Sequence, residues 1–394
     1  MNVTPMLQWE EAGAMCRARW RSEAGVAAPR RVMVVDDSLT ADAAYRLAGE
    51  GIALLWRGDF QNARQLLNAL ARRVDQKAAR AAGKQKARAA APENPAAASD
   101  AFNRHRLSRA QRARALGMLL IPLDAGYRIP LRRAPDMRVA CTEAYGPGDD
   151  TSSLTSVVSL RELLGLVGAH EWRKKGVDVP ALGARIHPHY GVFAPVRGEY
   201  VGLIAEAPLP TAIRGNSLAF DIGTGTGVLA AVLARRGVQK VIATDQDGRA
   251  LACARENLTR LGFTQQVEVV EADLFPPGRA PLIVCNPPWI PARPSAPIEY
   301  AIYDPDSRML RGFIDGLAMH LEADGEAWLV LSDIAEHLGL RTRAELLKIF
   351  DEGGVKVIAR SDVRPQHPRA ADASDPLHAA RAAEVTSLWR LKPG

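Results

Sequence analysis

A short apolar segment that runs into a glycine-rich loop constrains this chain more than any other feature. Leu218 to Ile222 predicts a buried strand, and the loop from Asp221 to Gly227 follows before a helical stretch. Glycines at every second position let the backbone approach a ligand at the carboxyl end of a strand. The spacing is G-x-G-x-G, so the G-x-G-x-x-G pyrophosphate cradle is the poorer match. An acid before a tight loop suits a ligand with a positively charged amino-acid end. The candidate ligand-binding positions are Asp221, Gly223, Thr224, Gly225 and Gly227.

Two further acids follow, each at the end of a predicted strand. The strand Val241 to Thr244 ends in Asp245, 24 residues after Asp221. A carboxylate there is placed to accept both hydroxyls of a ribose. After a helix, a third strand leads to Asp273, which suits an exocyclic adenine amine, and to Leu274, which suits packing on the base. A solvated strand end is the ordinary interpretation of each acid alone. Their order at consecutive strand ends indicates one ligand site.

The segment Asn286-Pro287-Pro288-Trp289 follows the apolar run Leu282 to Cys285 and therefore caps the end of a buried strand. Proline fixes its own φ and lacks an N–H, so the pair stiffens the turn and leaves carbonyls without intramolecular donors. The Asn286 side chain and a proline carbonyl can accept the two N–H bonds of a planar nitrogen group while Trp289 covers its face. A proline-rich loop with a packed tryptophan is the alternative interpretation.

In this order the motifs resemble the class I S-adenosylmethionine-dependent methyltransferases, over about residues 185 to 394. The resemblance implies S-adenosylmethionine as cofactor, with the glycine loop, Asp245 as the ribose acid and Asp273 on the adenine side. Asn286 to Trp289 looks like the Asn/Asp-Pro-Pro-aromatic signature of amino-methyltransferases. Glutamine enzymes of the HemK-like type, adenine N6 enzymes and guanine N2 ribosomal RNA enzymes share that signature. These four residues are therefore expected to be catalytic, with Asn286 also at the cofactor. No His/Cys metal spacing occurs, so no metal is expected.

The resemblance leaves the acceptor open. The leading interpretation is a glutamine side-chain amide in a protein of the translation machinery, and the alternative is a nucleic-acid base, either ribosomal RNA guanine N2 or adenine N6. Tyr303-Asp304-Pro305 is similar to a segment of the glutamine enzymes, but Asp304 stands where glutamate is usual. A module that only binds a nucleoside predicts a broken glycine loop or a lost asparagine, and both are intact.

A stretch upstream of the glycine loop also carries a resemblance. Tyr190 to Pro195 resembles the segment that closes over cofactor and substrate in small-domain methyltransferases, which makes Phe193 a candidate lid residue at the cofactor. A simple hydrophobic anchor is the alternative.

The C-terminal part predicts a doubly wound α/β domain. Strands are expected near residues 219, 242, 268, 283, 328, 356 and 387, with helices between them. A sheet of seven strands fits the Rossmann-like class I methyltransferase fold, in which the last strand runs antiparallel. We assign residues 185–394 to this domain.

The N-terminal half is a different kind of sequence. Helical periodicity from Asp42 to Val74 predicts a mainly helical N-terminal region over residues 1–75. Residues 76–100 are rich in Ala, Lys and Arg and predict a linker, followed by a basic α/β accessory region over residues 101–184. Between Arg64 and Arg138 basic residues outnumber acidic ones by roughly three to one. The net charge of +7 is therefore concentrated there.

A basic region of this kind suits ribosomal RNA or a ribosome-associated protein, and a solvated face is the alternative. The four cysteines are scattered and predict buried thiols in a reducing cytoplasm. No apolar run reaches the ~18 residues that a membrane span needs, and no secretory pattern opens the sequence. We therefore expect a cytoplasmic protein with no membrane partner.

Overall fold

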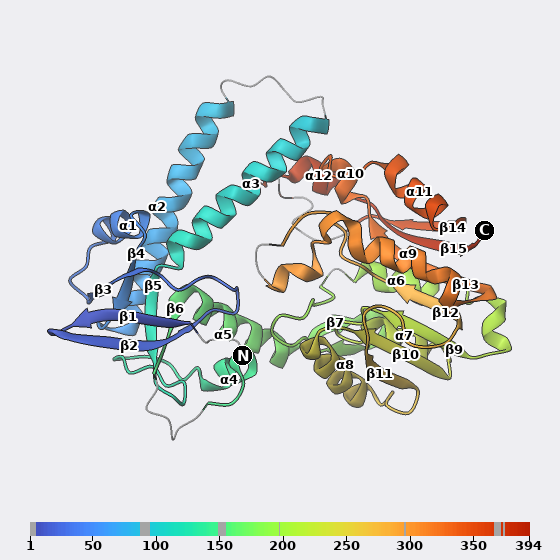
Figure 1. Ribbon diagram of the computed structural model, residues 1–394, viewed down its shortest axis with the longest axis horizontal. Helices are drawn as coiled ribbons and strands as arrows, with labels where there is room; N and C mark the ends of the chain where they lie inside the picture. The colour runs from blue at the N-terminus through green and yellow to red at the C-terminus, as the bar shows by residue number, and fades with distance from the viewer. Residues whose placement is uncertain are drawn as a thin grey trace. The chain divides into compact units, whose positions relative to one another are not determined.

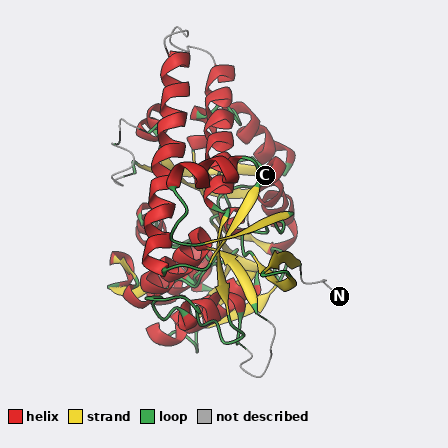
Figure 2. Cartoon of the chain, turned by 90° about the vertical axis from the view of Figure 1, so that its left-hand side faces the viewer, coloured by secondary structure: helices red, strands yellow, loops and turns green. Residues whose placement is uncertain are grey.

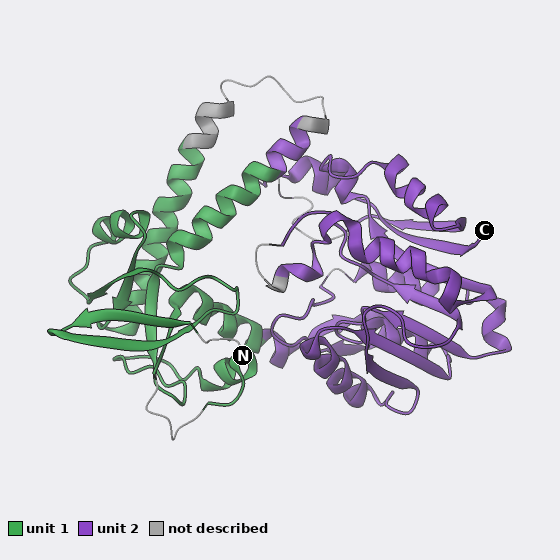
Figure 3. Ribbon diagram, viewed as in Figure 1, with its two compact units in different colours: residues 1–92, 103–171, 295–297 green, residues 93–102, 172–294, 298–394 purple. Residues whose placement is uncertain are grey.

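The computed structural model describes residues 5–86, 95–148, 155–196, 198–294, 297–365, 372 and 375–394. The chain divides into two compact units (Figure 3). Unit 1 comprises Met1–Pro92, Asn103–Glu171 and Ser295–Pro297. Unit 2 comprises Glu93–Phe102, Trp172–Pro294 and Ile298–Gly394.

Unit 2 is built on a sheet of seven strands within its described residues (Figure 1). They are β9 (Leu218–Ile222), β10 (Lys240–Asp245), β11 (Val267–Glu271), β12 (Ala280–Cys285), β13 (Leu321–Ser332), β14 (Val355–Val363) and β15 (Thr386–Pro393). Their order is β11-β10-β9-β12-β13-β15-β14. Only the pairs made by β15 are antiparallel in this described sheet. The predicted doubly wound fold with an antiparallel last strand is confirmed.

Helices cover both faces of this sheet. On one face lie α6 (Glu199–Glu206), α7 (Val228–Arg235) and α8 (Gly248–Leu261), and on the other lie α9 (Arg308–His320) and α11 (Arg343–Glu352). Successive strand residues alternate between the two cores, so that Ala219 packs on the first and Phe220 on the second. The remaining elements of unit 2 are short: β7 (Val177–Val179), β8 (Ala184–Ile186), α10 (Ile334–His337) and α12 (His378–Ala383).

Unit 1 contains a mixed sheet that has six strands in the described part of the chain. They are β1 (Met6–Glu11), β2 (Ala14–Arg21), β3 (Arg31–Val35), β4 (Ile52–Trp56), β5 (Leu119–Leu123) and β6 (Ser156–Ser159), in the order β1-β2-β6-β5-β4-β3. Its described helices are α1 (Ala41–Gly49), α2 (Phe60–Lys86) and α4 (Arg138–Tyr145), together with α3 (Pro95–Leu116) from Asn103 onward and α5 (Leu160–Lys175) as far as Glu171. The long helices α2 and α3, which can be followed in Figures 1 and 2, are joined by an ion pair between Arg112 and Asp75. Across the described residues, no helix is both long and apolar enough to cross a membrane.

The mainly helical N-terminal region needs a correction, because its helices accompany a sheet. Ile52 to Trp56, which the periodicity places in a helix, forms β4, where Leu54 and Leu55 have no exposed surface. A short strand buried on both faces carries the same apolar run as a turn of buried helix. The boundaries at 75 and 101 are wrong as well, because β4 pairs with β5 in one sheet. The linker predicted over residues 76–100 begins in α2 and ends in α3, and residues 87–94 lie outside the described residues.

A buried ion pair joins the antiparallel strand β15 to β13. Arg390 donates from Nε and Nη2 to the two carboxylate oxygens of Glu326 at 2.8 and 2.9 Å. The indole N–H of Trp328 donates to the same carboxylate at 3.2 Å. The Arg390 and Glu326 side chains are 18% and 7% exposed. Removing the charge of one partner therefore leaves the other poorly compensated in a region of low dielectric.

We expect Glu326→Gln to lower the free energy of unfolding by about 2–4 kcal/mol. Urea denaturation followed by circular dichroism measures this change. The matched control is Lys240→Gln, which removes an ion pair with Glu268 whose side chains are both 59% exposed. It should cost less than about 0.5 kcal/mol, because solvent screens the pair. Equal losses in the two variants would contradict a stabilising role for the buried pair.

Candidate active site at the carboxyl ends of the strands

The glycine loop links β9 to α7 and is held against β10. The Thr224 amide donates to the Thr244 carbonyl at 2.8 Å, and the Gly225 amide donates to the Asp245 carboxylate at 3.0 Å. Gly225 has a φ of 54°, and a Cβ added there would meet no atom within 4 Å. At Gly227, with a φ of 80°, a Cβ would lie 3.2 Å from the Cα of Ala254 in α8. The loop is therefore packed against α8 at Gly227, whereas Gly225 faces open space.

Asp221 lies under this loop. Asp221 is only 1% exposed. One carboxylate oxygen accepts from the Thr224 hydroxyl at 2.6 Å and from the Ala230 amide at 3.0 Å. Burial raises the pKa of Asp221 to about 6, and these two hydrogen bonds partly oppose the rise. Asp221 thus fixes the shape of the loop, and its predicted contact with a positively charged ligand stays a prediction.

Asp245 stands at the tip of β10, next to the open part of the loop. Its oxygens accept from the backbone amides of Gly225 and Asp247, each at 3.0 Å. Burial raises the pKa of this carboxyl, and the backbone hydrogen bonds lower it. An ionised carboxylate has about four acceptor positions, so some remain for further donors. A half-buried carboxylate with spare acceptor positions beside an open glycine fits the ribose diol of S-adenosylmethionine.

Asp273 and Leu274 follow β11 and come to the same edge of the sheet. The Leu274 carbonyl accepts from the Thr244 hydroxyl at 2.5 Å, which ties the ends of β11 and β10 together. Leu274 has a φ of 72°, an uncommon conformation for a leucine. Asp273 remains 66% exposed, with Arg308 Nη2 at 3.4 Å from its carboxylate. An exposed pair of this kind is weak, so Asp273 stays available to an exocyclic amine.

The start of α9 also reaches the glycine loop, which sequence reasoning missed. The methyl carbon of Met309 lies 2.6 Å from the place that a Cβ on Gly223 would take. Asp304 fixes this turn, because its carboxylate accepts from the amides of Met309 and Leu310 at 2.9 and 3.1 Å. Burial raises the pKa of Asp304. An Asp-Pro pair before an apolar helix signals such a cap, but no local pattern reveals the long-range contact with Gly223.

The segment Asn286 to Trp289 forms the turn that leaves β12. The indole N–H of Trp289 donates to the Asn286 side-chain oxygen at 2.9 Å. This bond uses one of the two lone pairs of that oxygen and leaves the other for an incoming N–H. Trp289 is partly buried and packs against both cores of unit 2 and against a cluster that contains Phe102. Trp289 therefore orients the Asn286 side chain through this hydrogen bond. A phenylalanine at the same position has no N–H and could not make it.

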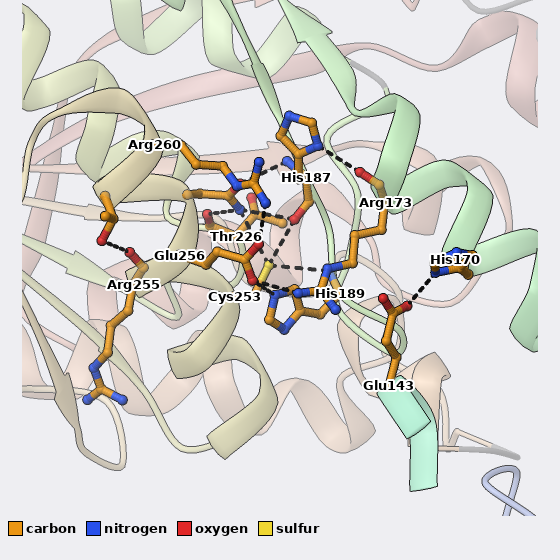
Figure 4. Close-up of polar contacts among 12 residues, drawn as sticks. Glu143, His170, Arg173, His187, His189, Thr226, Cys253, Arg255, Glu256 and Arg260 are labelled. Carbon is orange, nitrogen blue, oxygen red and sulfur yellow. Dashed lines mark hydrogen bonds and ion pairs between the residues drawn. The ribbon is translucent and has the colours of Figure 1, made fainter. Parts of the chain in front are cut away.

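The stretch that precedes Phe193 is anchored to α8 by an ionic network (Figure 4). Glu256 lies 2.7 Å from His189 Nε2 and accepts from Arg173 and Arg260, each at 2.6 Å. Burial alone would raise the pKa of Glu256, but the bonds to Arg260 and His189 and the charge of Arg173 hold it at about 2. Phe193, the candidate lid residue, lies four residues beyond His189 and is 39% exposed.

The structure brings most of the predicted site residues to one edge of the sheet. The ladders pair Ile222 with Thr244 on one side and with Cys285 on the other, so the glycine loop lies between Asp245 and the Asn286 turn. Asp273 and Leu274 extend this edge beyond β10. Carboxyl ends of adjacent parallel strands are where open α/β sheets bind their ligands.

Comparisons with known proteins were made over the same region. Residues 184–361 match the family described as "Methyltransferase small domain". A tRNA1(Val) (adenine(37)-N6)-methyltransferase of Bacteroides fragilis is 31% identical over 160 residues, which cover 36% of this chain and 67% of that protein. The enzyme of the same name from Bacteroides thetaiotaomicron is 28% identical over 162 residues, which cover 39% of this chain and 68% of that protein.

A release factor glutamine methyltransferase of Cereibacter sphaeroides is 38% identical over 129 residues, which cover 31% of this chain and 44% of that protein. The chain thus spans less than half of this relative and about two thirds of the tRNA relatives. The sheet order, the position of the glycine loop and these matches agree. The chain therefore belongs to the methyltransferase small-domain family, within the class I S-adenosylmethionine-dependent methyltransferases.

Proposed function

We propose that this methyltransferase acts on the planar NH2 group of a purine base in RNA. The observation that carries the proposal is the Asn286 turn, which ends β12 directly beside the glycine loop on β9. An oriented asparagine oxygen and the Pro287 carbonyl suit an acceptor nitrogen with two N–H bonds. Support for an RNA base comes from the two tRNA adenine relatives, whose matched length is about two thirds of each protein.

The residues of the turn suit a poor nucleophile. S-adenosylmethionine supplies a methyl group made electrophilic by its positive sulfur, so the leaving group needs no activation by the protein. The acceptor nitrogen is the harder part, because its lone pair is delocalised into the ring. Asn286 and the Pro287 carbonyl hold its two hydrogens, orient the lone pair and stabilise the positive charge that develops on nitrogen. The nitrogen proton becomes acidic only after transfer, so no dedicated general base is required.

A glutamine side-chain amide is the second candidate acceptor. The 38% identity with a release factor glutamine methyltransferase supports it. The oxygens of the same turn can accept the two N–H bonds of an amide as well as those of a base amine. Asp304 stands where the glutamine enzymes are expected to have glutamate, and here it caps α9. The two acceptors differ in width, because a flipped base needs a wide slot whereas an amide on a flexible arm needs a narrow channel.

Labelling of cell extract with tritiated S-adenosylmethionine separates the two candidates. The wild-type protein is expected to transfer label to the RNA fraction, in material that ribonuclease removes. Label found only in the protein fraction would reject the RNA proposal and favour the glutamine amide.

Asp245→Asn should weaken the binding of S-adenosylmethionine by about 30-fold or more, since charge-assisted bonds to two ribose hydroxyls contribute about 1.5–3 kcal/mol each. Isothermal titration calorimetry measures the affinity. Glu271→Gln is the matched control. Glu271 lies opposite Asp245 in the β10–β11 ladder, at the end of the neighbouring strand, and is exposed. A wild-type affinity in Asp245→Asn would contradict the ribose role.

Asn286→Ala should leave S-adenosylmethionine affinity within about twofold of wild type and reduce turnover at least about 100-fold. The reason is that the asparagine oxygen is proposed to bind the acceptor and stabilise charge only as transfer proceeds. Calorimetry and the tritium assay on the labelled fraction provide the two measurements. A variant that still methylates at the wild-type rate would remove this role.

Trp289→Phe should lower kcat by about 3- to 10-fold, because the ring remains and only the hydrogen bond to Asn286 is lost. Steady-state kinetics of methyl transfer test this prediction. Trp9→Phe provides the control, since the Trp9 indole also donates to a side chain, Glu11, at 2.9 Å, but lies in unit 1. An unchanged kcat in Trp289→Phe would show that the asparagine needs no such support.

A further inference from the structure

The two long helices of unit 1 carry an exposed arm with little core of its own. This basic arm is the part of α2 from Asp75 onward together with α3 from Asn103 to Leu116. Its helices are tied by Arg112, which donates to both Asp75 oxygens at 2.7 and 3.1 Å. On α2, burial ends near Leu70, and the described side chains from Asp75 to Arg80 are all exposed. A helical segment whose described side chains are all exposed gains little from packing, so packing does not explain why α2 extends past Asp75.

Apart from Asp75, the exposed charged residues on the described part of the arm are cations. Among the described side chains from Arg72 to Arg80 and from Asn103 to Leu116, the exposed arginines that form no ion pair are Arg72, Arg80, Arg104, Arg109 and Arg114. Asp75 is already engaged by Arg112. Guanidinium groups with no counter-charge in the protein attract the phosphates of a nucleic acid and release the counterions bound there.

The first turns of α3 belong to unit 2 and pack beside the acceptor turn. Phe102 is 3% exposed, and its ring lies 6.5 Å from the ring of Tyr303 at an angle of 61°. Trp289 packs against the same cluster, whose buried members are Phe102, Ile334, Leu338 and Leu377. Arg104 follows Phe102 by two residues in the same helix. The helix that bears three of the unpaired arginines therefore starts within unit 2, in the cluster against which Trp289 packs.

A bridging role and a membrane-anchoring role both fit the arm less well than a nucleic-acid contact. A bridge between the units accounts for α3, whose residues belong to both, but not for the exposed segment Asp75 to Arg80 of α2. Anchoring to a membrane surface needs an apolar face, and Leu107 is the one large apolar side chain that is exposed on the described part of the arm. A phosphate backbone needs cations and no apolar face.

We infer that the basic arm binds the sugar-phosphate backbone of the RNA substrate. The choice of RNA over other polyanions rests on the proposed function. The arm contributes affinity and position without reading sequence, because its contacts are to phosphates.

The test uses the full chain and a fluorescein-labelled RNA hairpin with a stem of about 20 base pairs. Anisotropy titrations at several salt concentrations compare wild type with the triple variant Arg80→Gln, Arg104→Gln, Arg109→Gln. The affinity of the variant should fall at least about tenfold at low salt, and its log–log salt slope should be shallower by about 2–3. The control triple variant is Arg17→Gln, Arg214→Gln, Lys356→Gln, which removes the same charge at exposed positions outside the arm.

Wild-type affinity in the arm variant, or an equal loss in the control variant, would overturn the inference. Stronger loss of binding to anionic lipid vesicles than to the RNA hairpin would overturn it as well. Failure of the proposed function has a different signature, since tritium would then enter protein and not RNA whatever the arm variant binds. Conversely, a result in which tritium enters RNA while the arm variant binds the hairpin as tightly as wild type would support the proposed function. The same result would reject the inference that the arm binds RNA.

Discussion

The glycine loop at the candidate site depends on one buried carboxylate, Asp221. It accepts from Thr224 in the glycine loop and from Ala230 in α7, so it fixes both the loop and the helix that follows. With the loop in this shape, the Gly225 amide points at Asp245 and the Thr224 amide at β10. Burial in the core disfavours the charged form of a carboxylate, and for this reason the pKa of Asp221 is raised.

Unit 1 contains a second buried carboxylate, Asp59, whose charge is stabilised by arginines. Asp59 accepts from Arg133 at 2.6 Å, from Arg132 at 3.2 Å and from the Gln61 amide at 2.8 Å. The bond to Arg133 is the main reason why the pKa of Asp59 falls to about 2. Positively charged donors thus stabilise the ionised form of Asp59, whereas the neutral donors around Asp221 only reduce the effect of burial. The second carboxylate secures a loop far from the methyltransferase motifs in the sequence.

Local features of unit 2 could be predicted from the sequence, whereas contacts between distant segments could not. The glycine loop, Asp245 and the turn after β12 each combine a strand with the residue that ends it, and such patterns are local. The bond from Trp289 to Asn286 spans three residues, yet it depends on a side-chain rotamer that composition does not encode. The contact of Met309 with Gly223 and the packing of Phe102 beside Tyr303 join segments far apart in the chain. In unit 1, the strand Ile52–Trp56 could not be predicted, because its apolar run is equally compatible with a buried helix.

The turn after β12 also has a consequence for how many methyl groups one nitrogen receives. In the proposed geometry, Asn286 and the Pro287 carbonyl each accept one hydrogen of the NH2 group, and the Trp289 indole occupies the other lone pair of the asparagine oxygen. A nitrogen that already carries one methyl group has a single hydrogen left. It would leave one of the two acceptors without a donor in a partly buried site, a loss of about 1–3 kcal/mol. In the proposed geometry, the turn after β12 would therefore favour release of the monomethylated product over a second transfer.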